Sequence, residues 1–248
     1  MKPVFTFFGI SFASYGVMCA LGVLCALVFS LIRVKRMHLR MEYAFVMFVF
    51  ALALGLAGAF FTHMIVSYSL KDIISMLRRG AIFQEYSPGF VFYGGFVFGL
   101  SGAYLASRLL NFRMTDYAPA MLPSLPLAHA FGRVGCFLAG CCYGIRCKFG
   151  FVYPPGGSAP SYISLFPVQL SESALLLVIC FLLCLYVKKG GKRALSMYVF
   201  LYAPVRFLLE FLRGDMHRGI FLSLSTAQWT SLILFILFLI PVKTLRRG

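Results

Sequence analysis

Apolar residues fill the chain in seven long runs, and short segments that carry most of the charges separate them. The runs cover residues 8–32, 43–66, 89–107, 119–140, 167–187, 194–213 and 225–242. A helix needs roughly 20 residues to cross the hydrocarbon core of a bilayer. The pattern therefore predicts an all-α integral membrane protein, with about seven transmembrane helices in a single transmembrane domain over residues 1–248. Pro119, Pro123 and Pro126 crowd the start of the fourth run, which is the least regular.

Two of the connecting segments have a pattern of their own. Residues 69–80 repeat apolar positions at helical spacing and open with a capping-box pattern of Ser69 and Asp72. We expect an amphipathic helix on the outer membrane surface, with an ordinary loop helix without lipid contact as the alternative. Residues 145–166 are rich in Pro and Gly, which predicts an extracytoplasmic loop over the outer ends of the spans.

The basic residues between the runs predict the orientation in the membrane. More than half of the 23 Lys and Arg residues lie in segments 33–40, 108–113 and 188–193 and in the C-terminal tail. By the positive-inside rule these segments face the cytoplasm, which places the N-terminus outside and the C-terminus inside. The net charge of +16 could suggest nucleic acid. Because the charges cluster between spans, we expect anionic lipid headgroups of the bilayer as partner, and no nucleic acid.

Small residues recur every four positions in the second and third runs, which predicts that both helices approach a neighbour closely. They are Ala51, Gly55, Ala59, Gly95, Gly99 and Ala103.

Few ionisable side chains lie within the apolar runs, and an unpaired charge at mid-depth costs roughly 3 kcal/mol on insertion scales. They are His63, His129, Arg133, Glu172, Arg206 and Glu210, with Arg213 near an outer end. Such residues are candidates for function. Arg206 and Glu210 are four residues apart, so they share a helix face and can neutralise each other.

Arg133 has no acid in its own run, so its partner is an acid from another helix or a bound anion. The abundant anion of a bilayer is phosphate, which matches the guanidinium fork. Gly132 and Gly135 would let a ligand approach the backbone. If Arg133 and Arg206 converge, they form a phosphodiester site.

Three further polar residues accompany these arginines. Gln169 and Glu172 lie at the start of the fifth run, where a carboxylate also favours the helix dipole. His129 precedes Arg133 by one turn, and it either satisfies a neighbouring carbonyl or acts as a base.

Four cysteines, Cys136, Cys141, Cys142 and Cys147, have the spacing C-x4-C-C-x4-C. Paired ligands of structural zinc sites are usually separated by two to four residues, and this cluster reaches that range only at its upper end, so we expect no metal here. We expect small packing residues or an extracytoplasmic disulfide, no metal site and no cofactor.

The motifs together resemble the prolipoprotein diacylglyceryl transferase family. They are SYGVM, YGGFVFG, GRVGCFLAGCCYG, PVQLSE, RFLLEFLR and STAQ, in that family's order over nearly the whole chain. The resemblance implies an enzyme of the bacterial cytoplasmic membrane. It would transfer the diacylglyceryl group of phosphatidylglycerol to the lipobox cysteine in a prolipoprotein signal peptide, forming a thioether and releasing glycerol phosphate.

The resemblance also implies roles for single residues. Arg133 would hold the phospholipid headgroup. Arg206 and Glu210 match a pair in the sixth span of the family, and Arg206 would stabilise the departing phosphate. The remaining residues that match family motifs at the phospholipid site are Tyr15, Gly144, Gln169 and Glu172. Gly132, Cys136 and Arg213 are expected beside them.

The chain departs from the family pattern at three places. Tyr93 replaces a histidine considered for proton abstraction, and a phenol is a poor base at neutral pH, so Tyr93 would position the lipid. Cys136 and Cys141 replace an asparagine and a glutamate, and Phe166 replaces another histidine. His129, Glu210 or the field of the arginines would then remove the thiol proton. A transferase with a different acceptor and a non-catalytic lipid-binding or transport protein are the alternatives.

Overall fold

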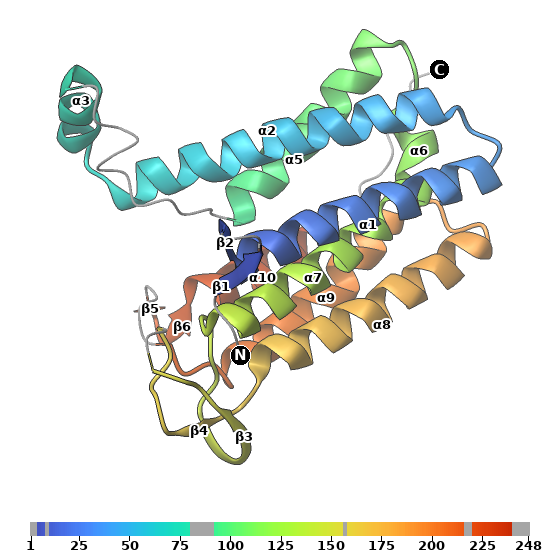
Figure 1. Ribbon diagram of the computed structural model, residues 1–248. Coiled ribbons are helices and arrows are strands. Elements are labelled where there is room, and N and C mark those ends of the chain that lie inside the picture. Colours follow the sequence, from blue (N-terminus) through green and yellow to red (C-terminus); the bar gives the residue numbers. More distant parts are fainter. Residues whose placement is uncertain (1–3, 8–9, 80–91, 156–157, 216–219, 240–248) are drawn as a thin grey trace. The chain divides into compact units, whose positions relative to one another are not determined.

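Each of the seven apolar runs contains a helix in the computed structural model, which describes residues 4–7, 10–79, 92–155, 158–215 and 220–239 (Figure 1). The main helices are α1 (Ser14–Arg36), α2 (Met41–Ser67), α5 (Phe92–Leu109), α7 (Ser124–Ala139), α8 (Val168–Lys188), α9 (Ala194–Glu210) and α10 (Thr226–Leu239). Two short helices are α3 (Leu70–Arg79) and α6 (Met114–Met121). Within the described ranges, three helices, α1, α2 and α8, are long and apolar enough to cross a membrane. The protein is therefore mostly helical, with several helices suited to a bilayer.

Two of the expected helical boundaries are wrong. The first run does not begin as a helix, because β1 (Val4–Phe7) and β2 (Ile10–Ala13) pair as an antiparallel hairpin before α1. Aromatic and β-branched residues in this segment favour strands. The fourth run is split into α6 and α7 around Pro123, because proline lacks an N–H donor and disfavours helix in the residue before it.

The Pro/Gly-rich segment after α7 is more ordered than a plain loop. Strand β3 (Arg146–Val152) pairs antiparallel with β4 (Ser164–Leu165). A further short hairpin, β5 (Ile220–Phe221) with β6 (Leu224–Ser225), precedes α10.

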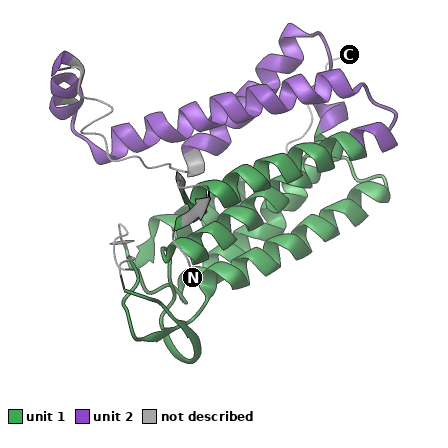
Figure 2. Ribbon diagram, viewed as in Figure 1, with its two compact units in different colours: residues 1–32, 118–248 green, residues 33–117 purple. Residues whose placement is uncertain are grey.

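The chain divides into two compact units, shown in Figure 2. Unit 2, residues 33–117, contains α2 and α5 packed side by side. A Cβ placed on Gly55 would lie 3.2 Å from the Gly95 carbonyl oxygen, and one on Gly99 would lie 3.2 Å from that of Ala51. The close approach predicted from the small residues of both helices is thus confirmed. Before α3, the Ser69 hydroxyl contacts the Asp72 carboxylate at 2.6 Å and accepts the Asp72 N–H at 3.3 Å, as in a capping box.

Unit 1, residues 1–32 and 118–248, is a bundle in which α7, α8, α9 and α10 are neighbours in chain order. Helix α1 joins it where Gly22 meets the Cβ of Phe131, and where the Ser30 hydroxyl donates to the Ser124 hydroxyl at 2.8 Å. Because consecutive helices run in opposite directions, the N-terminal ends of α8 and α10 meet the C-terminal ends of α7 and α9 (Figure 1). The polar residues singled out above in unit 1 gather at this end.

Candidate functional site

The Arg133 guanidinium of α7 lies against the Glu172 carboxylate of α8. Arg133 Nη2 and Glu172 Oε1 are 3.0 Å apart, and the Glu172 side chain is only 1% exposed. A buried carboxylate needs such a partner, because an unpaired charge removed from water costs several kcal/mol. Of the two partners considered for Arg133, an acid from another helix or a bound anion, the structure supplies the acid.

Aromatic side chains complete the surroundings of Glu172. The Tyr202 hydroxyl of α9 donates to Glu172 Oε1 at 2.8 Å, and His129 Nε2 lies 4.0 Å from the same oxygen. The His129 ring meets Tyr202 edge-on, and the Tyr198 ring stacks on that of Tyr202. One carboxylate thus organises polar groups from α7, α8 and α9.

Arg206 and Glu210 form the ion pair that their spacing predicted. Arg206 Nη2 and Glu210 Oε2 are 2.6 Å apart, and both side chains are buried. Pro204 lies inside α9 just before the pair, where it removes one backbone N–H donor from the helix.

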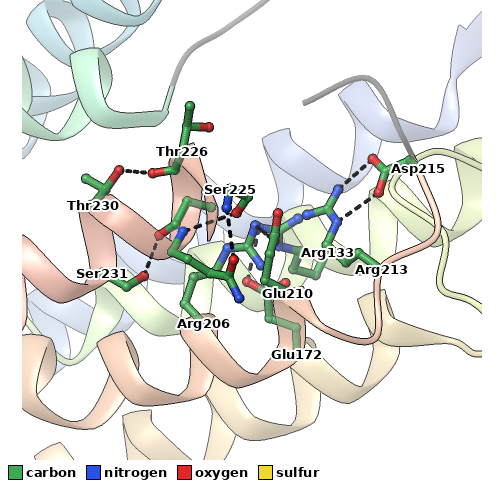
Figure 3. A network of polar contacts seen from close by, with 12 residues as sticks. Arg133, Glu172, Arg206, Glu210, Arg213, Asp215, Ser225, Thr226, Thr230 and Ser231 are labelled. Atoms are coloured by element: carbon green, nitrogen blue, oxygen red, sulfur yellow. Dashed lines mark hydrogen bonds and ion pairs between the residues drawn. The ribbon is translucent and has the colours of Figure 1, made fainter. Parts of the chain in front are cut away.

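The two arginines lie in one polar network, shown in Figure 3 with Glu172 and Glu210 between them. In each arginine a buried nitrogen, Nε of Arg133 and Nη1 of Arg206, has no hydrogen-bond acceptor within the described part of the chain. A guanidinium has five N–H donors, and a buried donor without an acceptor costs about 1–3 kcal/mol. The network therefore has unused capacity to bind the oxygen atoms of an anion.

A third pair closes the end of α9. Arg213 donates two bonds to Asp215, at 3.0 and 2.9 Å, and its side chain is almost fully buried. Burial raises the pKa of the Asp215 carboxyl above its ordinary value, although the charge of Arg213 acts in the opposite direction. Three arginines thus balance three acids at this site.

Gln169 ties α8 to the turn after α7. Its Nε2 donates to the Cys141 carbonyl at 2.7 Å and to the Tyr153 hydroxyl at 3.0 Å, and the side chain is 1% exposed. Both N–H donors of the amide are used in these bonds, so Gln169 fixes the backbone of this turn at the site.

Gly144 lies against main-chain carbonyl groups that leave no room for a side chain. A Cβ on Gly144 would lie 2.4 Å from the Phe166 carbonyl oxygen and 2.9 Å from that of Leu212. Gly144 also forms a bridge with Arg213, and Gly214 N–H donates to the Tyr143 carbonyl at 3.0 Å. The glycine joins the turn after α7 to the end of α9.

Three of the four spaced cysteines gather at the end of α7. The Sγ atoms of Cys136, Cys141 and Cys142 all lie within 4.8 Å of one another. Cys147 belongs to β3 and is not part of this group. The eight cysteines, all within the described residues, form no disulfide with one another.

The two glycines beside Arg133 differ. A Cβ on Gly132 would meet no heavy atom within 4 Å among the described residues outside its own helix, so the expected open space exists there. For Gly135 the expectation is wrong, because Tyr15 and Met18 of α1 already occupy the space, with Met18 Cβ at 3.1 Å. Tyr15 itself is 42% exposed. Tyr93 lies in the first turn of α5, in unit 2, and its side chain is outside the described residues.

A family model of prolipoprotein diacylglyceryl transferase matches residues 2–243. The chain belongs to this family. It is 36% identical over 242 residues to the phosphatidylglycerol–prolipoprotein diacylglyceryl transferase of Clostridium tetani (strain Massachusetts / E88), with 96% of this chain and 95% of the relative covered.

Two further bacterial members of the prolipoprotein diacylglyceryl transferase family are similar over most of their length. Phosphatidylglycerol–prolipoprotein diacylglyceryl transferase 2 of Clostridium perfringens (strain 13 / Type A) is 33% identical over 233 residues, covering 92% of this chain and 89% of the relative. The phosphatidylglycerol–prolipoprotein diacylglyceryl transferase of Dehalococcoides mccartyi (strain CBDB1) is 30% identical over 236 residues, covering 89% of this chain and 84% of the relative. The resemblance that the motifs suggested is confirmed at the level of the family.

Three residues of the site in this member of the prolipoprotein diacylglyceryl transferase family were missed by sequence reasoning. Tyr202 is one turn before Arg206, so the signal was a polar group on the same face of α9. Asp215 follows Arg213 by two residues, but it lies beyond the apolar run. Tyr153 had no signal, because its contact with Gln169 depends on the fold of the loop.

Replacing Gly144 by Ala is expected to destabilise the protein by about 1–3 kcal/mol, the range for overpacking. The added methyl group would press on two main-chain carbonyl groups, which cannot rotate away as a flexible side chain would. Thermal unfolding in detergent measures the effect as a lower Tm. Gly132→Ala is the matched control, because its methyl group enters open space in a helix and Ala favours helix. An equal Tm for both variants would contradict the packing role of Gly144.

Replacing Tyr202 by Phe is expected to lower activity about tenfold, because Glu172 loses a hydrogen bond to a charged group worth about 1.5–3 kcal/mol. Tyr198→Phe is the matched control: this buried hydroxyl has no hydrogen-bond partner within the described ranges. Turnover of a lipid substrate by the two variants checks the prediction. Similar losses in both would show that the stacked rings matter and the bond to Glu172 does not.

Proposed function

We propose that this protein transfers the diacylglyceryl group of phosphatidylglycerol to the lipobox cysteine of prolipoproteins. The sulfur of the acceptor forms a bond to the glyceryl carbon while the bond from that carbon to the phosphate oxygen breaks. The phosphate leaves with the bonding electron pair, as glycerol phosphate. Such a displacement needs a thiolate, an aligned electrophile and positive charge on the leaving phosphate.

The observation that carries the proposal is the pair of buried arginines with unused donors. Arg133 Nε and Arg206 Nη1 lie in one network and have no acceptor among the described residues. In a water-excluded site, preorganised donors stabilise a developing anion far more than they would in water. Phosphate oxygens match this arrangement, since a guanidinium binds them through parallel N–H bonds.

The paired acid of Arg206 gives the site a route for the thiol proton. The Arg206–Glu210 pair is neutral as a whole, so both groups are stable before substrate binds. When Glu210 accepts the thiol proton, its charge disappears and the guanidinium of Arg206 is released to donate to the leaving phosphate. Deprotonation of the acceptor and stabilisation of the leaving group are therefore coupled, and His129 stays beside Glu172.

The remaining residues would position the phospholipid. Arg133, held by Glu172, which also accepts from Tyr202, binds the headgroup phosphate, and the open space at Gly132 admits the glyceryl backbone. The other positioning residues are Tyr15 of α1, Cys136 of α7, Gly144 in the turn after α7, Gln169 of α8 and Arg213 after α9, with Tyr93 as a lipid contact.

All seven main helices would cross a bacterial cytoplasmic membrane as a single transmembrane domain. The antiparallel order of the unit 1 helices supports this arrangement, and so do the basic segments 33–40, 108–113 and 188–193. The N-terminus would then lie outside, the C-terminus in the cytoplasm, α3 on the outer surface and the site at the outer end of unit 1. Phosphatase fusions at the connecting segments test this topology.

The decisive experiment follows the headgroup of labelled phosphatidylglycerol in proteoliposomes. Glycerol phosphate is expected to be released only when a lipobox peptide is present, with one thioether formed per release. Release with a Cys→Ser lipobox peptide would indicate a different acceptor. No release under any condition would favour a lipid-binding or transport protein.

A further inference from the structure

Three thiols meet beside the arginines, and the proposed transfer uses none of them chemically. The Sγ atoms of Cys136, Cys141 and Cys142 lie within 4.8 Å of one another. In tetrahedral zinc sites the Zn–S distance is about 2.3 Å, which separates the sulfur atoms by about 3.8 Å. The sulfur separations therefore exceed those of a zinc site by about 1 Å at most. We call Cys136, Cys141 and Cys142 the thiol cluster.

The backbone at the end of α7 builds the thiol cluster. Gly140 has a φ of 72°, its N–H donates to the Phe137 carbonyl at 3.2 Å, and the Cys141 N–H donates to the Cys136 carbonyl at 3.1 Å. This is a Schellman motif, which places the second residue after the helix against a residue of its last turn. In this chain both residues are cysteines, so the motif brings their thiols together.

The third thiol depends on an unusual backbone conformation. Cys142 has a φ of 57°, a left-handed conformation that costs roughly 1–2 kcal/mol for a residue other than glycine. Such conformations persist where the surrounding structure holds them, and they cluster at functional sites. Here Gln169 holds the Cys141 carbonyl and Gly214 holds the Tyr143 carbonyl, on either side of Cys142.

The thiol cluster is only partly enclosed by the protein. Cys136 is buried, whereas Cys141 and Cys142 are only partly buried. The positive charges of Arg213 and Arg133 act on Cys142. The thiolate is the form that binds metals.

We propose that Cys136, Cys141 and Cys142 bind one zinc ion and that its open fourth position takes the acceptor thiol. Zinc sites with three protein ligands are typical of catalysis, because the fourth position is left for water or substrate. The acceptor in the proposed reaction is itself a thiol, and Arg133 lies one helical turn from Cys136. Zinc binding by the three cysteines does not depend on the proposed function. The identity of the fourth ligand rests on the proposed function, because that ligand is the acceptor thiol.

The proposed step is balanced in atoms and charge. The acceptor S–H loses its proton to Glu210 as the S–Zn bond forms, since a coordinated thiol is deprotonated. The bound sulfur then attacks the glyceryl carbon, and the phosphate leaves with the electron pair of the broken C–O bond. The product is a neutral thioether, a weaker ligand than a thiolate, so the S–Zn bond breaks and the product leaves.

The zinc content of the purified protein tests whether the thiol cluster binds zinc. The wild type, purified under reducing conditions and equilibrated with zinc, is expected to bind one zinc per chain. Cys136→Ser, Cys141→Ser and Cys142→Ser should each lower the content at least tenfold. Cys147→Ser is the matched control, because Cys147 lies in β3 outside the thiol cluster, and it should keep one zinc. No zinc in folded wild type, or a disulfide within the thiol cluster that excludes zinc, would overturn the proposal.

Cobalt substitution tests the fourth position. The charge-transfer absorption of thiolate-bound Co²⁺ is expected to increase by about a third when a lipobox peptide adds a fourth sulfur to three, and to stay unchanged with its Cys→Ser version. An unchanged spectrum with both peptides would overturn this half, as would full transfer activity in metal-free enzyme. The latter result would leave the proposed function intact. A spectral change without any transfer would refute the proposed function but keep the zinc-bound thiol.

Discussion

An Arg206→Ala enzyme is expected to lose about 10²–10³-fold in kcat, the loss typical when a preorganised donor to a developing anion is removed. Arg206 is buried, and besides its pair with Glu210 it has a donor nitrogen without an acceptor among the described residues. The measurement is release of glycerol phosphate from phosphatidylglycerol at saturating lipobox peptide.

The control separates catalysis from folding. Removing one partner of a buried ion pair costs about 3–5 kcal/mol, so Arg206→Ala also destabilises the protein by taking the Arg206 partner from Glu210. The double variant Arg206→Met/Glu210→Gln has no buried charge at this position, and its Tm should return toward the wild-type value while activity stays absent. Recovery of activity in this double variant would refute the role of Arg206 at the leaving phosphate.

An Arg133→Ala enzyme is expected to show about a 10²-fold lower kcat/KM, mainly through a higher KM for phosphatidylglycerol. Arg133 would hold the phosphate of the bound lipid throughout the reaction, so its loss weakens the ground state and the transition state alike. Arg133→Lys should recover little, because an ammonium lacks the planar fork. Kinetics at varied phosphatidylglycerol in mixed micelles check the prediction.

Two variants control for the lost partner of Glu172. Arg133→Ala/Glu172→Gln removes both charges of the pair, so it should fold better than the single variant without regaining lipid affinity. Arg146→Ala is the matched control for general charge, because Arg146 is an exposed arginine of β3. A KM equal to the wild type in Arg133→Ala would exclude Arg133 from the headgroup site.

What could be predicted from the sequence depended on how local each interaction is. The Arg206–Glu210 pair follows from helical spacing alone, and the structure has it. The sequence could not decide whether Arg133 is paired with an acid or with a bound anion. Glu172 is on another helix, and only the packing of α7 against α8 brings the two together. The start of α1 was misplaced because an apolar hairpin and an apolar helix look alike over a few residues.

The cysteines show where a spacing rule fails. Four residues separate Cys136 from Cys141, which is the upper end of the range for paired zinc ligands, so the spacing alone did not indicate a site. The left-handed Gly140 reverses the chain at the end of α7, so residues five apart come into contact. Glycine after an apolar helix was the available signal, but the position of Cys142 could not be read without its backbone conformation.

The distribution of the ion pairs has a consequence for how the protein is assembled. Arg206 and Glu210 belong to one helix, so α9 can enter the bilayer with its charges already neutralised. Arg133 and Glu172 belong to different helices, and either helix alone would bring an uncompensated charge into lipid. Helices α7 and α8 should therefore leave the insertion machinery together as a hairpin, whereas α9 can follow later. The helices of unit 1 would then be inserted into the membrane in the order in which they occur in the chain.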